Sequence, residues 1–198
     1  MENNIVISFI IPAHNSEKFL KRCVESVVKE EKQPKDNNLA EVIIIENGSS
    51  DHTKQIGTAL AEKYENVFLI CSEKGVSNAR NAGVKAAHGE WIFFLDADDY
   101  LPAGTLQKLL DTVNSGKAAD LYIFSYEKGN AIVNVATGEN ADGYEGTGVR
   151  ECLAGMLRNP TRCMAVWGKL FRHSIIQQSS LDFNKKLSLA EDSDFLIR

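Results

Sequence analysis

Three carboxylates follow an apolar run in the stretch WIFFLDADDYL, residues 91–101. The apolar run suits a buried strand, and Asp96, Asp98 and Asp99 come after it. If the strand continues to Asp98, the side chains of Asp96 and Asp98 project to one side, with Cα atoms about 6.6 Å apart. Two unpaired like charges there would be costly to bury. The pair therefore predicts a site where one carboxylate holds a ligand hydroxyl and the other holds Mg²⁺ or Mn²⁺ bridged to phosphates.

The same stretch has a simpler interpretation. A solvated turn would also place acids here, with Asp99 capping a helix that begins at Pro102. We assign Asp99 alone to that role and keep Asp96 and Asp98 as candidate site residues.

Polar residues also close two other apolar runs. Pro12, Ala13, His14 and Asn15 follow the run 5–11, and the sequence ENGSSD begins at Glu46, at the end of the run 41–46. In open α/β sheets, ligands bind in the crevice outside the carboxyl ends of the strands, so polar groups from three strands predict a site at that edge. Asn-Gly-Ser-Ser-Asp is also ordinary turn chemistry followed by a helix cap, and that alternative stays open.

A cation and an amide lie where a third helix should begin. A helix from Ser77 would place Arg80 and Asn81 in its first turn, where free N–H groups and the helix dipole favour an anion. A structural arginine covering the sheet edge is the alternative. Near the end of the chain, Glu191 and Asp192 are either functional acids or residues favoured at a helix N-terminus.

The elements that must position these residues alternate along the first 126 residues. Apolar runs at 5–11, 41–46, 66–71, 91–96 and 120–126 predict strands, and helical patterns at 19–28, 52–63, from 77 and at 102–115 separate them. This alternation predicts an α/β fold with a mostly parallel sheet flanked by helices. Residues 127–198 are less regular, with hairpins, a helix near 148–158 and another from 191 that has no stop signal, so we expect the chain to continue.

Composition excludes several classes of protein. The net charge is −5 in 198 residues, so no overall positive field would hold nucleic acid. The four cysteines are widely spaced and suggest neither a zinc site nor disulfides. The apolar N-terminal run is too short for a signal peptide or a membrane span, and we expect a cytoplasmic protein.

Four ordered segments resemble the family 2 inverting glycosyltransferases of the GT-A fold. They are SFIIPAHNSEKFLKRCVESV, EVIIIENGSSDHT, GVSNARNAGVKAAHGEWIFFLDADDYL and EDSDF. A D-x-D alone is a weak signal, but the ordered set is specific. The resemblance implies a nucleoside-diphosphate-sugar donor, usually UDP-linked, a divalent metal, and a glycan or lipid-linked acceptor in surface polysaccharide synthesis. A lipid-linked acceptor would bring the protein to the inner face of the membrane. We expect residues 1–126 to bind the donor and 127–198 to form the acceptor side.

The resemblance also implies roles for individual residues. It makes Asp98 the metal ligand and Asp192 the general base that accepts the proton of the acceptor hydroxyl. The implied donor-binding residues are Pro12, Ala13, His14, Asn15, Glu46, Asn47, Arg80 and Asp96.

Two departures from the family pattern leave the nucleobase open. His14 stands where the family often has Tyr, and Glu46-Asn47 stands where it often has two Asp residues. The segment WGKLFR, 167–172, resembles an acceptor-side segment of bacterial transferases, with core packing as the alternative for Trp167. Two other functions stay open. One is a sugar nucleotidyltransferase, although this sequence lacks the glycine-rich basic loop expected after the first strand of such an enzyme. The other is a non-catalytic nucleotide-sugar-binding domain.

Overall fold

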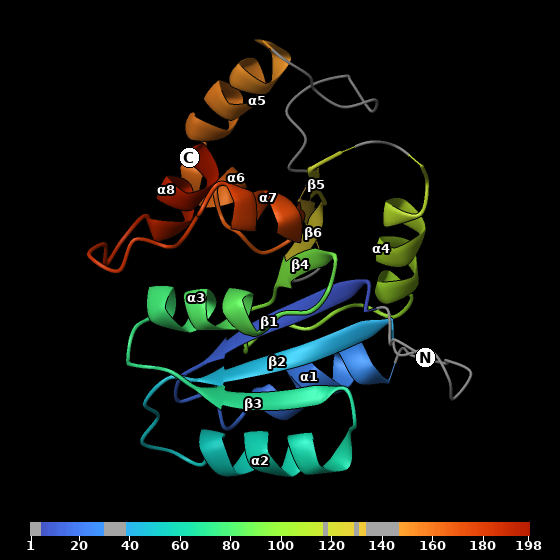
Figure 1. Cartoon of the computed structure of the whole chain (residues 1–198), viewed down its shortest axis with the longest axis vertical. Coiled ribbons are helices and arrows are strands. Elements are labelled where there is room, and N and C mark those ends of the chain that lie inside the picture. The colour runs from blue at the N-terminus through green and yellow to red at the C-terminus, as the bar shows by residue number, and fades with distance from the viewer. Residues whose placement is uncertain (1–4, 30–38, 117–118, 129–130, 134–146) are drawn as a thin grey trace.

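The computed structural model describes residues 5–29, 39–116, 119–128, 131–133 and 147–198. A six-stranded sheet with the order β3-β2-β1-β4-β8-β5 forms its centre (Figure 1). The pairings β1–β2, β1–β4 and β2–β3 are parallel, whereas β8 runs antiparallel to both β4 and β5. The predicted mostly parallel α/β sheet is therefore confirmed. Its strands are β1 (Ile7–Ala13), β2 (Ala40–Glu46), β3 (Val67–Cys71), β4 (Trp91–Phe94), β5 (Leu121–Ile123) and β8 (Lys169–Arg172).

Helices cover both faces of this sheet, with α3 on one face and α1 and α2 on the other (Figure 1). A separate two-stranded sheet, β6 with β7, follows β5. The helices are α1 (Leu20–Val28), α2 (Thr53–Lys63), α3 (Val76–Ala86), α4 (Thr105–Val113), α5 (Thr147–Leu157), α6 (Pro160–Cys163), α7 (His173–Gln178) and α8 (Glu191–Ile197). The small strands are β6 (Tyr126–Lys128) and β7 (Ala131–Val133).

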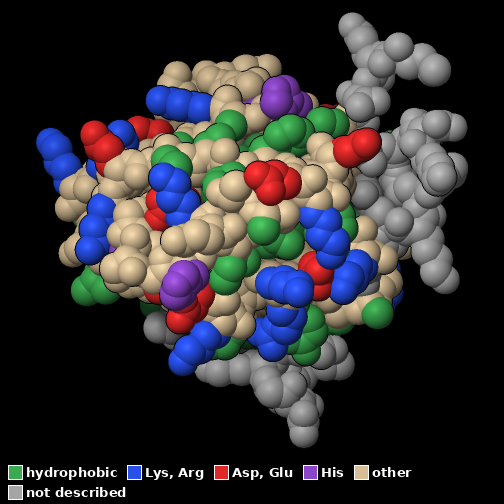
Figure 2. Space-filling view, turned by 90° about the horizontal axis from the view of Figure 1, so that it is seen from below, with side chains coloured by type: hydrophobic (Ala, Val, Ile, Leu, Met, Phe, Trp, Pro, Cys, Tyr) green, Lys and Arg blue, Asp and Glu red, His purple; other side chains and the backbone are tan. Residues whose placement is uncertain are grey.

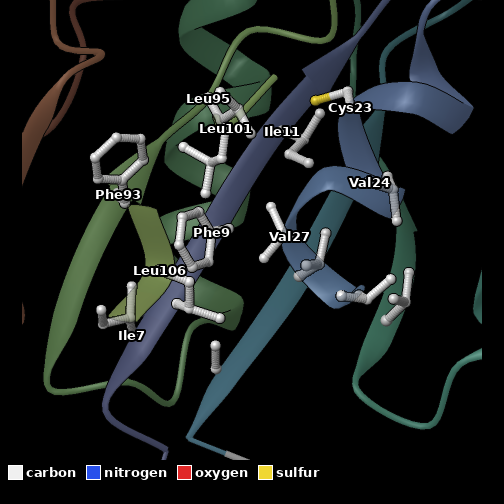
Figure 3. Packing of buried hydrophobic residues seen from close by; sticks show 14 of the residues in the cluster. Ile7, Phe9, Ile11, Cys23, Val24, Val27, Phe93, Leu95, Leu101 and Leu106 are labelled. Atoms are coloured by element: carbon white, nitrogen blue, oxygen red, sulfur yellow. The ribbon is translucent and has the colours of Figure 1, made fainter. Parts of the chain in front are cut away.

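The pleat of β1 divides the core into two parts. Ile7, Phe9 and Ile11 pack on the side of α1 and α4, whereas Ile10, between them, packs on the side of α3. Figure 3 shows Ile11 next to Cys23 of α1, and Phe9 close to Leu106 and Val27. The second part contains an aromatic cluster in which the rings of Phe183 and Phe195 stack with centroids 4.1 Å apart. Because both faces of β1 are covered, its residues form a nearly continuous apolar run.

The strand that carries the carboxylates ends earlier than the sequence predicts. β4 stops at Phe94, and the backbone N–H of Asp99 donates to the carbonyl of Asp96 at 3.0 Å, which closes a turn over 96–99. The argument that two carboxylates share one side of a continuing strand is therefore wrong. The assignment of Asp99 as a helix cap is also wrong, since α4 begins at Thr105 after Gly104, whose φ is 79°.

The region after residue 126 supplies a strand that the sequence analysis missed. The predicted strand at 120–126 is two strands, β5 and β6, in different sheets. Residues of WGKLFR form β8, which inserts between β4 and β5. Much of the predicted hairpin region, 134–146, lies outside the described residues. Sheet and C-terminal segment are therefore parts of one layered structure.

The surface and the helix lengths bear on membrane contact. Within the described ranges, no helix is both long and apolar enough to cross a bilayer. The face on the side of α2 shows basic, acidic and apolar side chains interspersed (Figure 2).

Candidate functional site at the strand ends

A pocket of about 320 Å³ opens at the carboxyl ends of β1, β2 and β4. This is the edge where an open α/β sheet binds its ligands. Several predicted donor residues line the pocket, together with Asp98, the predicted metal ligand. The lining residues are Pro12, His14, Asn15, Ser16, Phe19, Asn47, Val76, Asp96, Ala97 and Asp98. The structure thus gathers residues from separate strand ends around one cavity.

Hydrogen bonds join the loop after β1 to the loop after β2. The Asn15 side-chain oxygen accepts the N–H of Ser50 at 2.8 Å, and the Asn15 N–H donates to Ser49 Oγ at 3.1 Å. His14 Nδ1 lies 3.1 Å from the carbonyl of Asn47. Asn15 has a φ of 50°, a conformation that Asn tolerates better than most residues. One wall of the pocket is therefore held in shape by its own polar groups.

Two predicted donor residues, Ala13 and Glu46, are buried and do not line the pocket. Ala13 is fully buried in the core. Glu46 is buried, and its Oε1 accepts the N–H of Ser49 at 2.5 Å, closing the turn after β2. Glu46 therefore shapes the loop whose residue Asn47 lines the pocket.

Asp96 and Asp98 leave the turn after β4 in different environments. Asp96 is half-buried, and burial raises its pKa to about 6, although the nearby Arg80 guanidinium acts in the opposite direction. Asp98 is exposed at the pocket, and its backbone carbonyl accepts a hydrogen bond from Arg22 at 2.8 Å. The exposed carboxylate of Asp98 is thus the more accessible of the two to a cation.

A divalent cation fits this arrangement in one particular way. The described residues contain no cluster of three or more His, Cys, Asp or Glu side chains that would hold a metal alone. Mg²⁺ is usually bound by one or two carboxylates, with substrate phosphates and water completing its shell. The exposed carboxylate of Asp98, which lines the pocket, suits that binding mode, in which a diphosphate supplies the remaining oxygens.

Arg80 lies outside the pocket and is buried, with its side chain only 5% exposed. α3 begins at Val76, so Arg80 is in the second turn, and the prediction that it sits in the first turn is wrong. Its Nη1 lies 2.5 Å from Asp192 Oδ1 and 3.3 Å from Glu191 Oε1, and its Nη2 lies 3.6 Å from Asp96 Oδ1. Arg80 therefore connects the turn after β4 to the start of α8.

Asp192 is held from two sides. Its Oδ1 meets Arg80, and its Oδ2 accepts the N–H of Val166 at 3.1 Å. The side chain is 19% exposed, and burial raises its pKa, opposed by Arg80 and by the Val166 N–H. Ala190, just before α8, has a φ of 63°, which is uncommon for a residue other than glycine. The acid is therefore fixed in one orientation next to the strand-end site.

The segment around β8 borders this acid. Lys169 is buried, its Nζ donates to the carbonyl of Ala165 at 2.5 Å, and burial lowers its pKa to about 8. The ring of Trp167 packs edge-on against Tyr126, with centroids 4.5 Å apart.

Sequence reasoning missed four residues that line the pocket, Ser16, Phe19, Val76 and Ala97. The helical periodicity places Phe19 with the core residues of α1, yet it is 43% exposed. Phe19 directly precedes Leu20, the first residue of α1. Its position in the segment between the first strand and this helix was the signal that it could line the pocket.

Comparisons with known proteins agree with this fold. The sequence profile described as Glycosyl transferase family 2 matches residues 8–177. The chain is 29% identical over 201 residues to EpsH of Bacillus subtilis, covering 97% of this chain and 55% of EpsH. It is 27% identical over 199 residues to the poly(ribitol-phosphate) beta-N-acetylglucosaminyltransferase TarS of Staphylococcus aureus, covering 96% of this chain and 32% of TarS.

Solved structures show the same architecture. A crystal structure of Staphylococcus aureus TarS residues 1–349 with UDP superposes with a TM-score of 0.77 at 23% identity, covering 96% of this chain and 54% of that one. A mannosyltransferase of Pyrobaculum calidifontis with GDP-Man and Mn²⁺ gives a TM-score of 0.64 at 17% identity, covering 97% of this chain and 51% of that one. The chain thus spans about half the length of EpsH and of these two structures. With the GT-A architecture and a profile match over most of its length, the chain belongs to glycosyl transferase family 2.

Proposed function

We propose that this chain binds a nucleoside-diphosphate sugar and transfers a hexosyl unit, with inversion, to a hydroxyl of a glycan or lipid-linked acceptor in surface polysaccharide synthesis. One observation carries the proposal: a pocket at the strand ends is lined by the exposed Asp98, and the carboxylate of Asp192 is linked through Arg80 to the same turn. This arrangement combines a place for a polar donor with a fixed acid beside it.

The comparisons favour UDP as the nucleotide. TarS is solved with UDP and with UDP-GlcNAc, whereas the more distant mannosyltransferase is solved with GDP-Man and Mn²⁺. Two relatives are named as transferases of poly(ribitol-phosphate), a polymer. We therefore propose a UDP-linked donor, Mn²⁺ or Mg²⁺, and a polymer acceptor. A lipid-linked acceptor would place the protein at the inner face of the membrane.

Within the pocket, each group has a proposed task. The wall formed by Pro12, His14, Asn15 and Asn47 receives the nucleoside, and buried Ala13 and Glu46 belong to the strands that carry it. Asp96 holds hydroxyls of the donor, and Asp98 is the ligand of the metal. Residues 1–126 supply this pocket, and 127–198 supply the acceptor side.

Inverting transfer requires a base on the face opposite the leaving diphosphate. Asp192 takes the proton of the acceptor hydroxyl as the new bond forms. Binding in the pocket holds the donor in line for that attack. A divalent cation bound at Asp98 would offset the charge that develops on the diphosphate.

A thermal-shift panel tests the proposal. The protein is heated with UDP, GDP, TDP or CDP sugars, each with Mn²⁺ and with EDTA. A donor at about 100 times its Kd should stabilise the folded chain by about 2.7 kcal/mol, and EDTA should reduce that gain. Absence of a shift with every sugar nucleotide would contradict the proposal. Pyrophosphate release from a nucleoside triphosphate and a sugar phosphate would instead indicate a nucleotidyltransferase.

Binding and transfer need separate measurements. Release of the nucleoside diphosphate in the presence of polyol-phosphate or glycan acceptors measures turnover. Donor binding without release, across an acceptor panel, would indicate a non-catalytic binding domain.

A further inference from the structure

The guanidinium of Arg80 lies within 4 Å of three carboxylates, those of Asp96, Glu191 and Asp192. Arg80 Nη1 contacts Asp192 and Glu191, and Nη2 lies 3.6 Å from Asp96. These acids come from two different segments, the turn after β4 and the first turn of α8. With three acids around one arginine, the cluster is net negative when all are ionised.

The position of Arg80 is tightly determined. Its guanidinium lies over the ring of Phe183, 5.3 Å from the centroid. The side-chain amide of Asn81, the next residue of α3, exchanges two hydrogen bonds with the backbone of Phe183, at 2.9 and 2.7 Å. Arg80 and the segment around Phe183 are thus both held by α3. Arg80 is not among the residues that line the pocket.

One donor of Arg80 is left over. Nε is buried and has no hydrogen-bond partner among the described residues. A buried unpaired donor is unfavourable, so it is kept only where the other contacts of the side chain outweigh its cost. The Nη groups that face the carboxylates make those contacts.

The surroundings of Asp192 make its charge dependent on Arg80. The groups that face it are Arg80 from α3, Glu191 on its own helix, Lys169 from β8 and Asp96 from the turn after β4. Burial and Glu191 oppose its ionisation, and the charges of Asp96 and Asp192 repel each other. Of the two cations, Arg80 is in direct contact, and the Nζ of Lys169 donates to the carbonyl of Ala165.

We propose that Arg80 is a positioning residue: it orients the carboxylate of Asp192, keeps it charged for proton abstraction and joins it to Asp96, rather than binding the donor diphosphate. The inference rests on the proposed function for the role of Asp192 as base. The ionisation of Asp192, however, can be measured without donor or acceptor. The two statements can therefore fail separately.

The first experiment is an NMR titration of the Asp ¹³Cγ resonances, with Asp192 assigned by comparison with Asp192→Asn. Arg80→Met should raise the pKa of Asp192 by about one to three units, the size of effect that an adjacent arginine has on Asp. Arg80→Lys should give a smaller rise in the pKa of Asp192, because lysine keeps the positive charge but lacks the two Nη groups that face Asp96 and Asp192. Lys85→Met, which removes an exposed cation from the same helix, should leave the pKa unchanged.

The second experiment uses the donor and acceptor identified by the panel. Arg80→Met should lower kcat at neutral pH, shift the acid limb of the kcat profile to higher pH, and leave the donor Kd within about threefold, with Arg80→Lys intermediate. A loss of donor affinity with an unmoved pH profile would assign Arg80 to the diphosphate and overturn the inference. An unchanged Asp192 pKa in both variants would overturn it as well. If Arg80→Met does not fold, Arg80→Lys decides on the same criteria.

Discussion

Arg80 and Asp192 lie 112 positions apart in the chain and meet at 2.5 Å. The contact joins α3, which packs on the parallel strands, to α8, near the end of the chain. It also fixes the acid near a pocket that neither residue lines. The relation between the strand-end pocket and the proposed base therefore depends on this buried ion pair.

The metal assignment predicts different behaviour for two neighbouring acids. Asp98→Asn should abolish the EDTA-sensitive part of the donor-induced thermal shift, because it removes the exposed carboxylate at the pocket. Asp99→Asn removes the same charge from the next residue, which does not line the pocket, so this variant should keep the EDTA-sensitive shift. Equal losses in both variants would point to general electrostatics and against a specific ligand.

The base assignment predicts loss of turnover without loss of binding. Asp192→Asn keeps the size of the side chain but cannot take a proton, so kcat should fall by roughly 10²- to 10⁴-fold while donor affinity is maintained. Steady-state kinetics and donor titration provide the two readouts. Asp194→Asn is the control, since Asp194 is on the same helix and pairs with Arg198 at 2.8 Å. Unchanged turnover in Asp192→Asn would remove this residue from the base role.

Buried Lys169 predicts a pH dependence of stability. Its pKa falls from 10.5 to about 8 on folding, so between these values the unfolded chain binds more protons than the folded one. The free energy of unfolding of the wild type, relative to Lys169→Met, should therefore rise with pH across this window, by on the order of 3 kcal/mol in total at about 1.36 kcal/mol per pKa unit.

Urea titrations from neutral pH to about pH 10 measure this difference. Comparison with Lys169→Met cancels the contribution that the lysines and tyrosines shared by both proteins make to the pH dependence of stability. Lys85→Met, at an exposed position, should show no such trend against the wild type. A flat difference for Lys169→Met would show that the buried amine keeps its ordinary pKa.

The packing of α2 and α3 against the sheet predicts different effects on stability for alanine at one glycine in each helix. A Cβ at Gly83 would lie 2.4 Å from Ile10 Cγ2 and 2.9 Å from Ile45 Cδ1, so Gly83→Ala should push α3 from the sheet and cost about 1–3 kcal/mol. At Gly57 of α2, a Cβ would meet the ends of the Leu69 side chain, which can move. Gly57→Ala should therefore be neutral or gain up to about 1 kcal/mol from helix propensity.

Chemical denaturation of the two alanine variants tests this contrast. Because α3 carries Arg80, Gly83→Ala should also lower kcat more than Gly57→Ala does. Equal stability of both variants would mean that α3 does not need a glycine where it crosses β1.

The strands and the site edge could be predicted from local patterns. The apolar runs that became β1 and β2 are covered on both faces, and such strands show as continuous hydrophobic segments. The helix from Ser77 was also predicted close to its observed start at Val76. Since parallel strands end at a common edge, the polar residues after β1, β2 and β4 were expected together, and residues from all three loops line one pocket.

Other features depended on contacts that local patterns do not contain. β8 is four residues long, and its place between β4 and β5 follows from pairing with strands far away in the chain. The turn at 96–99 replaced a strand that periodicity allowed to continue, because a backbone hydrogen bond closes it. Local reasoning left Arg80 with two roles, binding an anion at a helix terminus or taking a structural place over the sheet edge, and it identified none of the three carboxylates that Arg80 contacts.

The sequence by itself determined the kinds of element, the sheet edge that carries polar groups, and a family resemblance that the comparisons confirm. Only the tertiary structure decided which charges neutralise one another. Arg80 meets Asp96 and Asp192 because the sheet and the aromatic cluster around Phe183 bring three distant segments together. An ion pair carries no periodic signature, and the partner of a buried charge is set by the fold that excludes water around it.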